Sequence, residues 1–289
     1  MYHKSRFAAA LAAVGCIGLA GCAAQPKEGS AGANAATLSV KGSDTMVQLA
    51  QAWAEAFMKA HPDVRVSVTG GGSNTGFTAL ISKGADIANA SRAIKPEEAE
   101  SAAKKGVTPK EFVVAQDALS IIVNKANPVT ELTMDQLKDI YTAKVTNWKD
   151  VGGSDAPIVL NARESSSGTS TFFQEHVLGK GTPYAATAML QPATSQIVSG
   201  VGQDAGAIGY VGLGYLNDTV KAILLKKDAG SDAVAPTVAN VVNGTYLLAR
   251  PLFEYTNGEP SGTAKVWLDW VRGPEGQAIV KKLDFVPAE

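Results

Sequence analysis

Cysteine and histidine are almost absent from this sequence of 289 residues. Both cysteines, Cys16 and Cys22, lie close to the N-terminus, and the whole chain contains only three histidines. The rest of the chain therefore cannot form a disulfide framework or a cysteine-based metal site. No group of histidines and carboxylates has the spacing of metal ligands either, so we expect neither a metal nor a cofactor.

An excess of charge of either sign is also lacking. The chain has 26 lysine and arginine residues against 27 aspartate and glutamate residues, a formal net charge of −1. This balance argues against a nucleic-acid partner, because nucleic-acid-binding domains carry a basic surface. With 45% hydrophobic and 18% charged residues, the chain can bury a large core, and its length fits one large domain or two medium ones.

The N-terminus has the pattern of an export signal. Lys4 and Arg6 precede an apolar stretch over residues 7–20, which is too short to remain in a bilayer as a spanning helix. This stretch ends in Leu-Ala-Gly directly before Cys22 and so resembles the processing site of a bacterial lipoprotein. We predict a signal peptide over residues 1–21 and a lipid on Cys22; an ordinary signal peptide that is cut nearby is the alternative.

Residues 22–36 are predicted to be a flexible tether, because they are rich in alanine and glycine and contain no large apolar side chain. No later apolar run reaches the length of a transmembrane helix. The folded part should begin near Thr37 and lie on the extracytoplasmic side of a membrane, in the periplasm or at the outer face of the cell membrane.

Apolar residues after Thr37 alternate between strand spacing and helix spacing. They predict strands at 37–41, 64–68, 86–90, 119–124 and 157–161, and helices at 46–60, 77–84 and 96–105. Thr133 and Gln136 have the spacing of a capping box and predict the start of another helix. The alternation indicates an α/β protein with parallel sheets flanked by helices, and about 250 ordered residues favour two such domains.

Three predicted strands end in loops rich in glycine, serine and threonine, each just before a helix. These loops are residues 42–45, 70–76 and 163–170, and the third begins with Arg163. A helix N-terminus presents free N–H groups and a partial positive charge, and glycine lets an anion approach the backbone. Helix capping explains any single loop more readily. Three such loops at the carboxyl ends of strands favour an anion site.

The sequences of these loops resemble those of phosphate-binding proteins of bacterial phosphate ABC importers, in the type II periplasmic-binding-protein superfamily. The resemblance extends over nearly the whole chain after the signal peptide. It includes DIANASR at 86–92, GAIGYV at 206–211 and YLLARPLF at 246–253. It implies a monomer that is not an enzyme, captures inorganic phosphate and delivers it to the membrane subunits of an ABC permease.

The resemblance also implies two α/β domains with the anion between them. The first would comprise residues 37–115 plus 237–289, and the second residues 116–236. Two crossovers near 113–118 and 226–237 would join these domains.

The ligands of phosphate follow from the resemblance, residue by residue. Hydroxyl groups, backbone N–H groups and one guanidinium would hold the phosphate oxygens, and they come from Thr45, Met46 N–H, Ser73, Arg163, Ser167, Gly168 N–H and Thr169. Ser43 and Asp44 of the first loop complete the predicted site.

One position departs from the family pattern. Well-studied members carry an aspartate after the serine of the third strand, where it accepts the proton of phosphate and excludes sulfate, whereas Arg92 follows Ser91 here. Arg92 is predicted to be a second cation at the site, with a solvated, outward-facing side chain as the alternative. Asp44 and Glu164 are the candidates for the missing acceptor, although Asp44 fits a helix cap equally well.

Two other functions stay open from the sequence. A binding protein for sulfate or molybdate would use the same loops, and the arginine at position 92 leaves this possibility in place. A secreted phosphatase or serine hydrolase fits less well, because only His61 and His176 remain after the signal peptide. Residues 165–168 also lack the Gly-x-Ser-x-Gly pattern of a nucleophile elbow.

Overall fold

The computed structural model describes residues 35–288. The predicted signal peptide, Cys22 and almost all of the predicted tether lie outside these residues. The described residues fall within one compact unit. None of the helices in this part of the chain combines the length and the hydrophobicity that spanning a bilayer requires.

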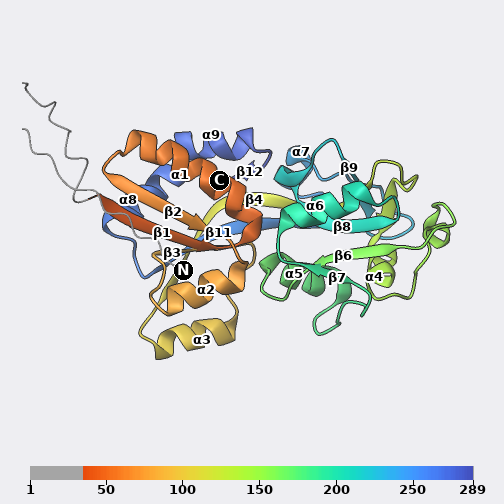
Figure 1. Ribbon diagram of the computed structural model, residues 1–289, viewed down its shortest axis with the longest axis horizontal. Helices are drawn as coiled ribbons and strands as arrows, with labels where there is room; N and C mark the ends of the chain where they lie inside the picture. The colour runs from red at the N-terminus through yellow and green to blue at the C-terminus, as the bar shows by residue number, and fades with distance from the viewer. Residues whose placement is uncertain (1–34, 289) are drawn as a thin grey trace, which may run out of the picture. The chain divides into compact units, whose positions relative to one another are not determined.

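A mixed sheet runs through this unit in the order β2–β1–β3–β11–β4–β8–β6–β7 (Figure 1). At one end, parallel pairing joins β1 (Ala36–Gly42), β2 (Val64–Thr69) and β3 (Ile87–Ala90). At the other end, parallel pairing joins β6 (Val159–Arg163), β7 (Met189–Gln191) and β8 (Ala207–Gly212). The antiparallel strands β4 (Pro109–Asn124) and β11 (Ala249–Asn257) connect the two ends.

This mixed pairing corrects one prediction, because the alternation of strands and helices favoured parallel sheets. β4 and β11 run in opposite directions through the middle of the sheet and pair antiparallel with their neighbours. β4 also begins at Pro109, whereas the apolar pattern indicated a strand only from Leu119. Its first half is only partly covered, so polar residues occupy the exposed positions and interrupt the apolar run.

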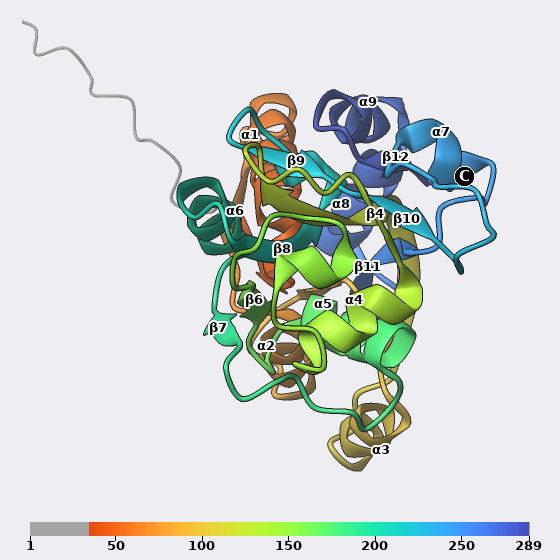
Figure 2. The same cartoon turned by 90° about the vertical axis from the view of Figure 1, so that its right-hand side faces the viewer.

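Helices cover both faces of the sheet, which confirms the predicted α/β fold. In the first half, α1 (Val47–Ala60), α8 (Gly262–Arg272) and α9 (Pro274–Lys282) share one core, and α2 (Ser73–Ile81) and α3 (Pro96–Lys104) lie on the opposite face (Figures 1 and 2). In the second half, α6 (Thr194–Gln203) lies opposite α4 (Met134–Tyr141) and α5 (Gly168–Phe173), and α7 (Val238–Val242) contacts β4. The remaining strands are β5 (Glu131–Thr133), β9 (Val220–Ala222), β10 (Leu224–Lys226) and β12 (Val286–Pro287).

The predicted capping box at the start of α4 is confirmed. Thr133 Oγ1 accepts a hydrogen bond from the Gln136 N–H at 3.1 Å, and Gln136 Oε1 accepts one from the Thr133 N–H at 2.9 Å. Two backbone N–H groups that have no partner inside the helix are thereby satisfied. The predicted helices at 46–60 and 96–105 correspond to α1 and α3 with nearly the same bounds.

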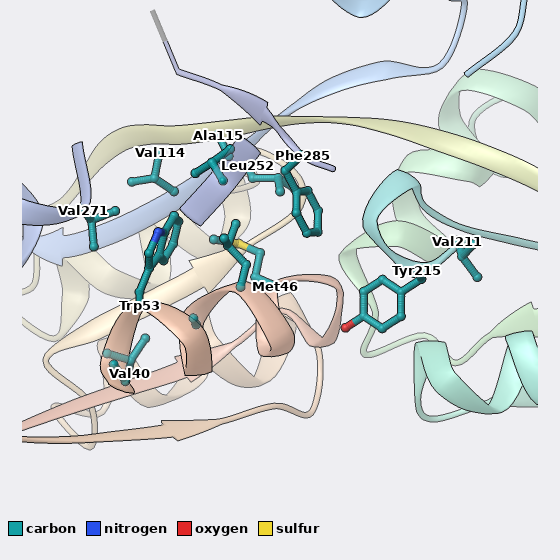
Figure 3. Packing of buried hydrophobic residues seen from close by; sticks show 14 of the residues in the cluster. Val40, Met46, Trp53, Val114, Ala115, Val211, Tyr215, Leu252, Val271 and Phe285 are labelled. Atoms are coloured by element: carbon teal, nitrogen blue, oxygen red, sulfur yellow. The ribbon is translucent and has the colours of Figure 1, made fainter. Parts of the chain in front are cut away.

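The core between α1 and the sheet fixes the position of the first glycine- and serine-rich loop. Met46 and Trp53 are fully buried, and Figure 3 shows Met46 beside Leu252 and Phe285. Met46 directly follows the loop residues 42–45. Packing of its side chain therefore holds this loop against the core.

The carboxyl group of Glu254 lies in the same buried core. Glu254 on β11 is fully buried, and its Oε2 accepts a hydrogen bond from Trp267 Nε1 at 2.9 Å. Among the described residues, Glu254 Oε1 has no partner, and neither has Oδ1 of Asn89, which is paired directly with Glu254 across β3 and β11. Burial raises the pKa of Glu254 to about 8. A protonated Glu254 provides a donor on the face that it shares with Asn89.

We predict that Glu254→Gln removes a pH dependence of stability. Between the ordinary pKa of 4.5 and the folded value of about 8, the unfolded chain loses a proton that the folded chain keeps. The free energy of unfolding of the parent protein should therefore fall as the pH rises through this window, by at most roughly 5 kcal/mol. Glutamine keeps the shape and both hydrogen-bonding roles without the charge, so the variant should lack this decline.

Urea unfolding at a series of pH values measures this difference. The two proteins should have similar stability near the acidic end of the window and diverge toward its alkaline end. Parallel stability curves for the two proteins would contradict a buried, neutral Glu254.

Candidate functional site

Four buried hydroxyl groups meet at the carboxyl ends of the parallel strands. Thr45 Oγ1 lies 2.7 Å from Thr169 Oγ1, and Ser91 Oγ lies 3.4 Å from both Thr169 Oγ1 and Ser73 Oγ. These four residues, which we call the hydroxyl cluster, are each at most 2% exposed. They follow β1, β2, β3 and β6, so the cluster joins segments from both ends of the sheet.

Two helices begin at the hydroxyl cluster. Ser73 is the first residue of α2, and Gly168 and Thr169 are the first residues of α5. Within the described chain, the N–H groups of Gly168 and Thr169 have no hydrogen-bond acceptor. Such N–H groups and the partial positive charge of a helix N-terminus favour an anion.

Glycine is required where α5 approaches α2. A Cβ atom at Gly168 would overlap Ser73 Oγ and lie 2.9 Å from Ser91 Oγ. At Gly72, φ is +97°, and a Cβ atom would overlap the backbone oxygen of Ser166. The second and third loops can therefore come together only because both positions lack a side chain.

The Arg163 side chain lies beside the first loop and is 2% exposed. Its Nε, Nη1 and Nη2 donate to Gln191 O, Thr194 Oγ1 and Pro192 O at 3.2, 2.6 and 2.7 Å. A guanidinium has five N–H donors, so two remain beyond these three bonds. Burial lowers the pKa of Arg163 from its ordinary value, and the carboxylate of Asp44 acts in the opposite direction.

Asp44 connects the first loop to the second half of the sheet. Its Oδ2 accepts from the N–H and the hydroxyl of Thr194 at 2.6 and 2.8 Å, and it lies 3.4 Å from Nη1 of Arg163. The Tyr215 hydroxyl donates to Asp44 O at 2.9 Å, and Figure 3 shows this hydroxyl pointing toward the start of α1. Among the described contacts, Asp44 does not cap its own helix with its side chain.

A buried ion pair lies next to the hydroxyl cluster. Arg250 Nη2 and Nε donate to Asp117 Oδ2 at 2.9 and 3.1 Å, and Arg250 Nη1 donates to Ser91 O at 3.3 Å. The carboxylate also accepts from the Leu213 N–H at 2.9 Å. Because Asp117 lies on β4 and Arg250 on β11, this pair ties the two connecting strands to the residue that follows β3.

Three of these residues were not predicted from the sequence: Ser91, Asp117 and Arg250. Ser91 and Arg250 lie inside segments that carried the family resemblance, but nothing in the sequence indicated what they contact. Asp117 is a lone carboxylate at the edge of an apolar run, which is a signal for a buried partner. The partner, Arg250, becomes evident only from the pairing of β4 with β11.

Arg92 is buried rather than solvated, with 6% of the residue exposed. Its described hydrogen bonds go to Glu98, to Asn74 Oδ1 and to Ala93 O, and none reaches the hydroxyl cluster. This burial excludes the alternative of an outward-facing side chain. Its Nε is buried and has no described partner.

The other predicted ligands lie in the same loops but differ in what they offer. Ser167 Oγ accepts from the Ser170 N–H at 3.3 Å and caps α5. The Met46 N–H already donates to Ser43 O at 3.1 Å, and the Ser43 N–H donates to Asn89 O at 2.8 Å. The structure therefore brings Thr45 and Thr169 into direct contact, links Ser73 to them through Ser91, and places the remaining predicted residues around them.

In the part of the chain that the structure describes, neither histidine lies beside these hydroxyls to act as a general base. His61 and His176 stack on Phe57 and Phe172, with ring centroids 4.3 and 4.0 Å apart, and neither has a described bond to the hydroxyl cluster. Activation of a serine or threonine as a nucleophile needs such a base. Among residues 35–288, no group of histidine, cysteine or carboxylate side chains is arranged to hold a metal ion. The arrangement suits binding of an oxyanion rather than catalysis.

Comparisons with known proteins agree with this geometry. A family model described as a PBP superfamily domain matches residues 28–275. Protein SphX of Synechococcus elongatus is 38% identical over 247 residues, which cover 82% of this chain and 72% of that protein. The phosphate-binding protein PstS of Pseudomonas aeruginosa is 34% identical over 281 residues, which cover 91% of this chain and 87% of that protein.

A solved structure is also similar. It is a putative phosphate ABC transporter substrate-binding protein from Clostridium perfringens with bound phosphate, at 35% identity and a TM-score of 0.81. The match covers 88% of this chain and all of that one.

The close approach of Gly168 to Ser73 generates a prediction. Gly168→Ala should weaken anion binding at least about tenfold, because the added Cβ displaces the Ser73 hydroxyl and separates the two loops. Isothermal titration with phosphate measures the affinity. Gly84→Ala is the matched control, since a Cβ there meets only atoms at 3.6 Å or beyond. Equal affinities of the two variants would show that the loops need not approach this closely.

Proposed function

Because this chain belongs to the phosphate-binding proteins of the PBP superfamily, we propose that it captures inorganic phosphate at the hydroxyl cluster and delivers it to the membrane subunits of an ABC importer. The observation that supports this proposal is the convergence of four buried hydroxyls and the N-terminus of α5 on one point. Like its relatives, the chain is a binding protein and not an enzyme.

Hydrogen bonds supply the affinity in this proposal. Phosphate oxygens accept from Thr45, Ser73, Ser91 and Thr169 and from the free N–H groups at the start of α5. Bonds to a charged group contribute about 1.5 to 3 kcal/mol each. Several of them offset the desolvation of the anion and leave the roughly 8 kcal/mol that corresponds to micromolar affinity.

In this proposal, Arg163 supplies the positive charge that faces the anion. We assign its guanidinium to the anion because Arg163 begins the third loop, lies beside Asp44 of the first loop, and makes only three hydrogen bonds among the described contacts. The predicted ligands Ser43, Met46 and Ser167 support the first and third loops, and we propose that they also contact phosphate.

Preference for phosphate over sulfate requires an acceptor for the phosphate proton. We assign this role to Asp44, because Thr194 and Arg163 hold its Oδ2 while its Oδ1 has no hydrogen bond among the described contacts. Glu164 is the second candidate, since it directly follows Arg163 in the third loop.

Phosphate would lie between two domains in this proposal, residues 37–115 plus 237–289 and residues 116–236. Bonds between the first two loops and residues 165–194 support such a closed arrangement. We also propose that the exported protein acts as a monomer on the extracytoplasmic side.

Thermal unfolding of residues 29–289 with phosphate, sulfate and molybdate tests the function. Phosphate at about 1,000 times its dissociation constant should add roughly 4 kcal/mol of stability and raise the melting temperature. Arg163→Ala should lose most of this shift, whereas Arg65→Ala, at an exposed position on β2, should retain it. A shift with sulfate or molybdate but not with phosphate would assign another oxyanion. No shift with any of the three would refute an oxyanion site.

Membrane attachment is proposed to depend on Cys22. In an expressing bacterium, Cys22→Ala should abolish labelling with a palmitate analogue and release the protein from the membrane fraction, because the thiol is the only site for the lipid after cleavage. Cys16→Ala is the matched control, since that residue is removed with the signal peptide. Retention of the Cys22 variant after a high-salt wash would place the anchor elsewhere.

A further inference from the structure

Asn74 forms the contact between the second and third loops. Its N–H donates to Ser166 O at 3.1 Å, and its side-chain Nδ2 donates to Ser165 O at 3.0 Å. Asn74 directly follows Ser73, and residues 165–166 directly precede Ser167, the N-cap of α5. These two bonds therefore join the segments that carry Ser73 and Thr169 of the hydroxyl cluster.

The side chain of Asn74 is oriented by Arg92. Arg92 Nη2 donates to Asn74 Oδ1 at 2.5 Å. An amide group has an acceptor end and a donor end, so fixing Oδ1 on a guanidinium turns Nδ2 toward Ser165 O. Without this bond, the amide is free to rotate and loses its fixed donor direction.

Arg92 is itself held from two sides. Its Nη1 and Nη2 donate to the two carboxylate oxygens of Glu98 at 2.8 and 2.6 Å, and its guanidinium lies 4.9 Å from the ring centroid of Phe77. Burial acts to raise the pKa of Glu98, but the hydrogen bonds from Arg92 and from the Lys95 N–H bring it below the ordinary value. Glu98 is thus an ionised partner that fixes the fork geometry of the arginine.

We propose that Arg92 is a positioning residue that slows the release of phosphate. It acts through Asn74, whose amide holds residues 165–166 against α2 while phosphate occupies the hydroxyl cluster. Opening of the site must break the bond from Asn74 Nδ2 to Ser165 O. This inference rests on the proposed function and assigns Arg92 a role different from that of a ligand, because its described bonds end on Asn74, Glu98 and Ala93.

The competing role is a direct cation at the anion through the unpaired Nε. The two roles differ in kinetics. A cation that faces the anion attracts it, so its loss slows binding and changes the salt dependence. A contact that forms on closure acts on the dissociation rate and leaves the association rate nearly unchanged.

The test measures both rates with the full exported protein. Dissociation is followed by release of radiolabelled phosphate into excess unlabelled phosphate, and association by stopped-flow fluorescence. Asn74→Ala and Arg92→Ala should each raise the dissociation rate about tenfold, the effect of one lost bond of this kind. The double variant should release phosphate no faster than either single variant, because both substitutions remove the same contact.

Two further variants complete the design. Glu98→Gln should also raise the dissociation rate, since it weakens the paired hydrogen bonds that hold Arg92. Lys104→Ala removes an equal charge from an exposed position on α3 and should leave both rates unchanged. Asn74→Ala keeps the ion pair of Arg92 and Glu98 intact, so this variant still tests the inference if Arg92→Ala does not fold.

The outcomes separate this inference from the proposed function. A parent protein that retains no phosphate overturns both. A parent protein that retains phosphate, with an unchanged dissociation rate in Asn74→Ala, overturns the positioning role alone. Additive effects in the double variant, or a slower and more salt-dependent association in Arg92→Ala, would assign Arg92 to the anion directly.

Discussion

The cost of burying hydrogen-bonding groups governs this site. A hydroxyl both donates and accepts, so Thr45, Ser73, Ser91 and Thr169 can satisfy one another when they are brought together out of water. The N–H groups of Gly168 and Thr169 can only donate, and no described residue accepts from them. The unprotonated oxygens of an oxyanion offer only acceptors. These oxygens therefore complement the N–H groups and turn the hydroxyls into donors, at a place where the protein alone leaves donors in excess.

The geometry of the cluster depends on contacts that lie outside it. The ion pair of Asp117 and Arg250 is buried, and its arginine also bonds to the backbone of Ser91. Loss of one partner would leave a buried charge without compensation, which is far more costly than the net gain from the pair. The two strands that connect the ends of the sheet are thereby held to the loop that supplies one of the four hydroxyls.

Local patterns in the sequence predicted much of this structure. Helical spacing located α1 and α3, the capping box located α4, and the three loops contained three of the four hydroxyls of the cluster. These features depend on residues a few positions apart. Contacts set by strand pairing could not be predicted from such local patterns. Asp117 and Arg250 are an example, because they are 133 positions apart. The same limit applies to Arg92, because its burial depends on how the loop before α3 folds back onto α2.

Near-neutrality of the whole chain has a consequence for how salt acts on the protein. Electrostatic screening has a length of about 8 Å at physiological ionic strength and is weak inside a buried site. The groups around the hydroxyl cluster are neutral hydroxyls, backbone dipoles and buried, paired charges, and little long-range field from a net charge of −1 exists to be screened. Salt should therefore have little influence on how strongly an anion is retained. Electrostatic screening alone should therefore change the affinity of this binding protein little between low and physiological ionic strength.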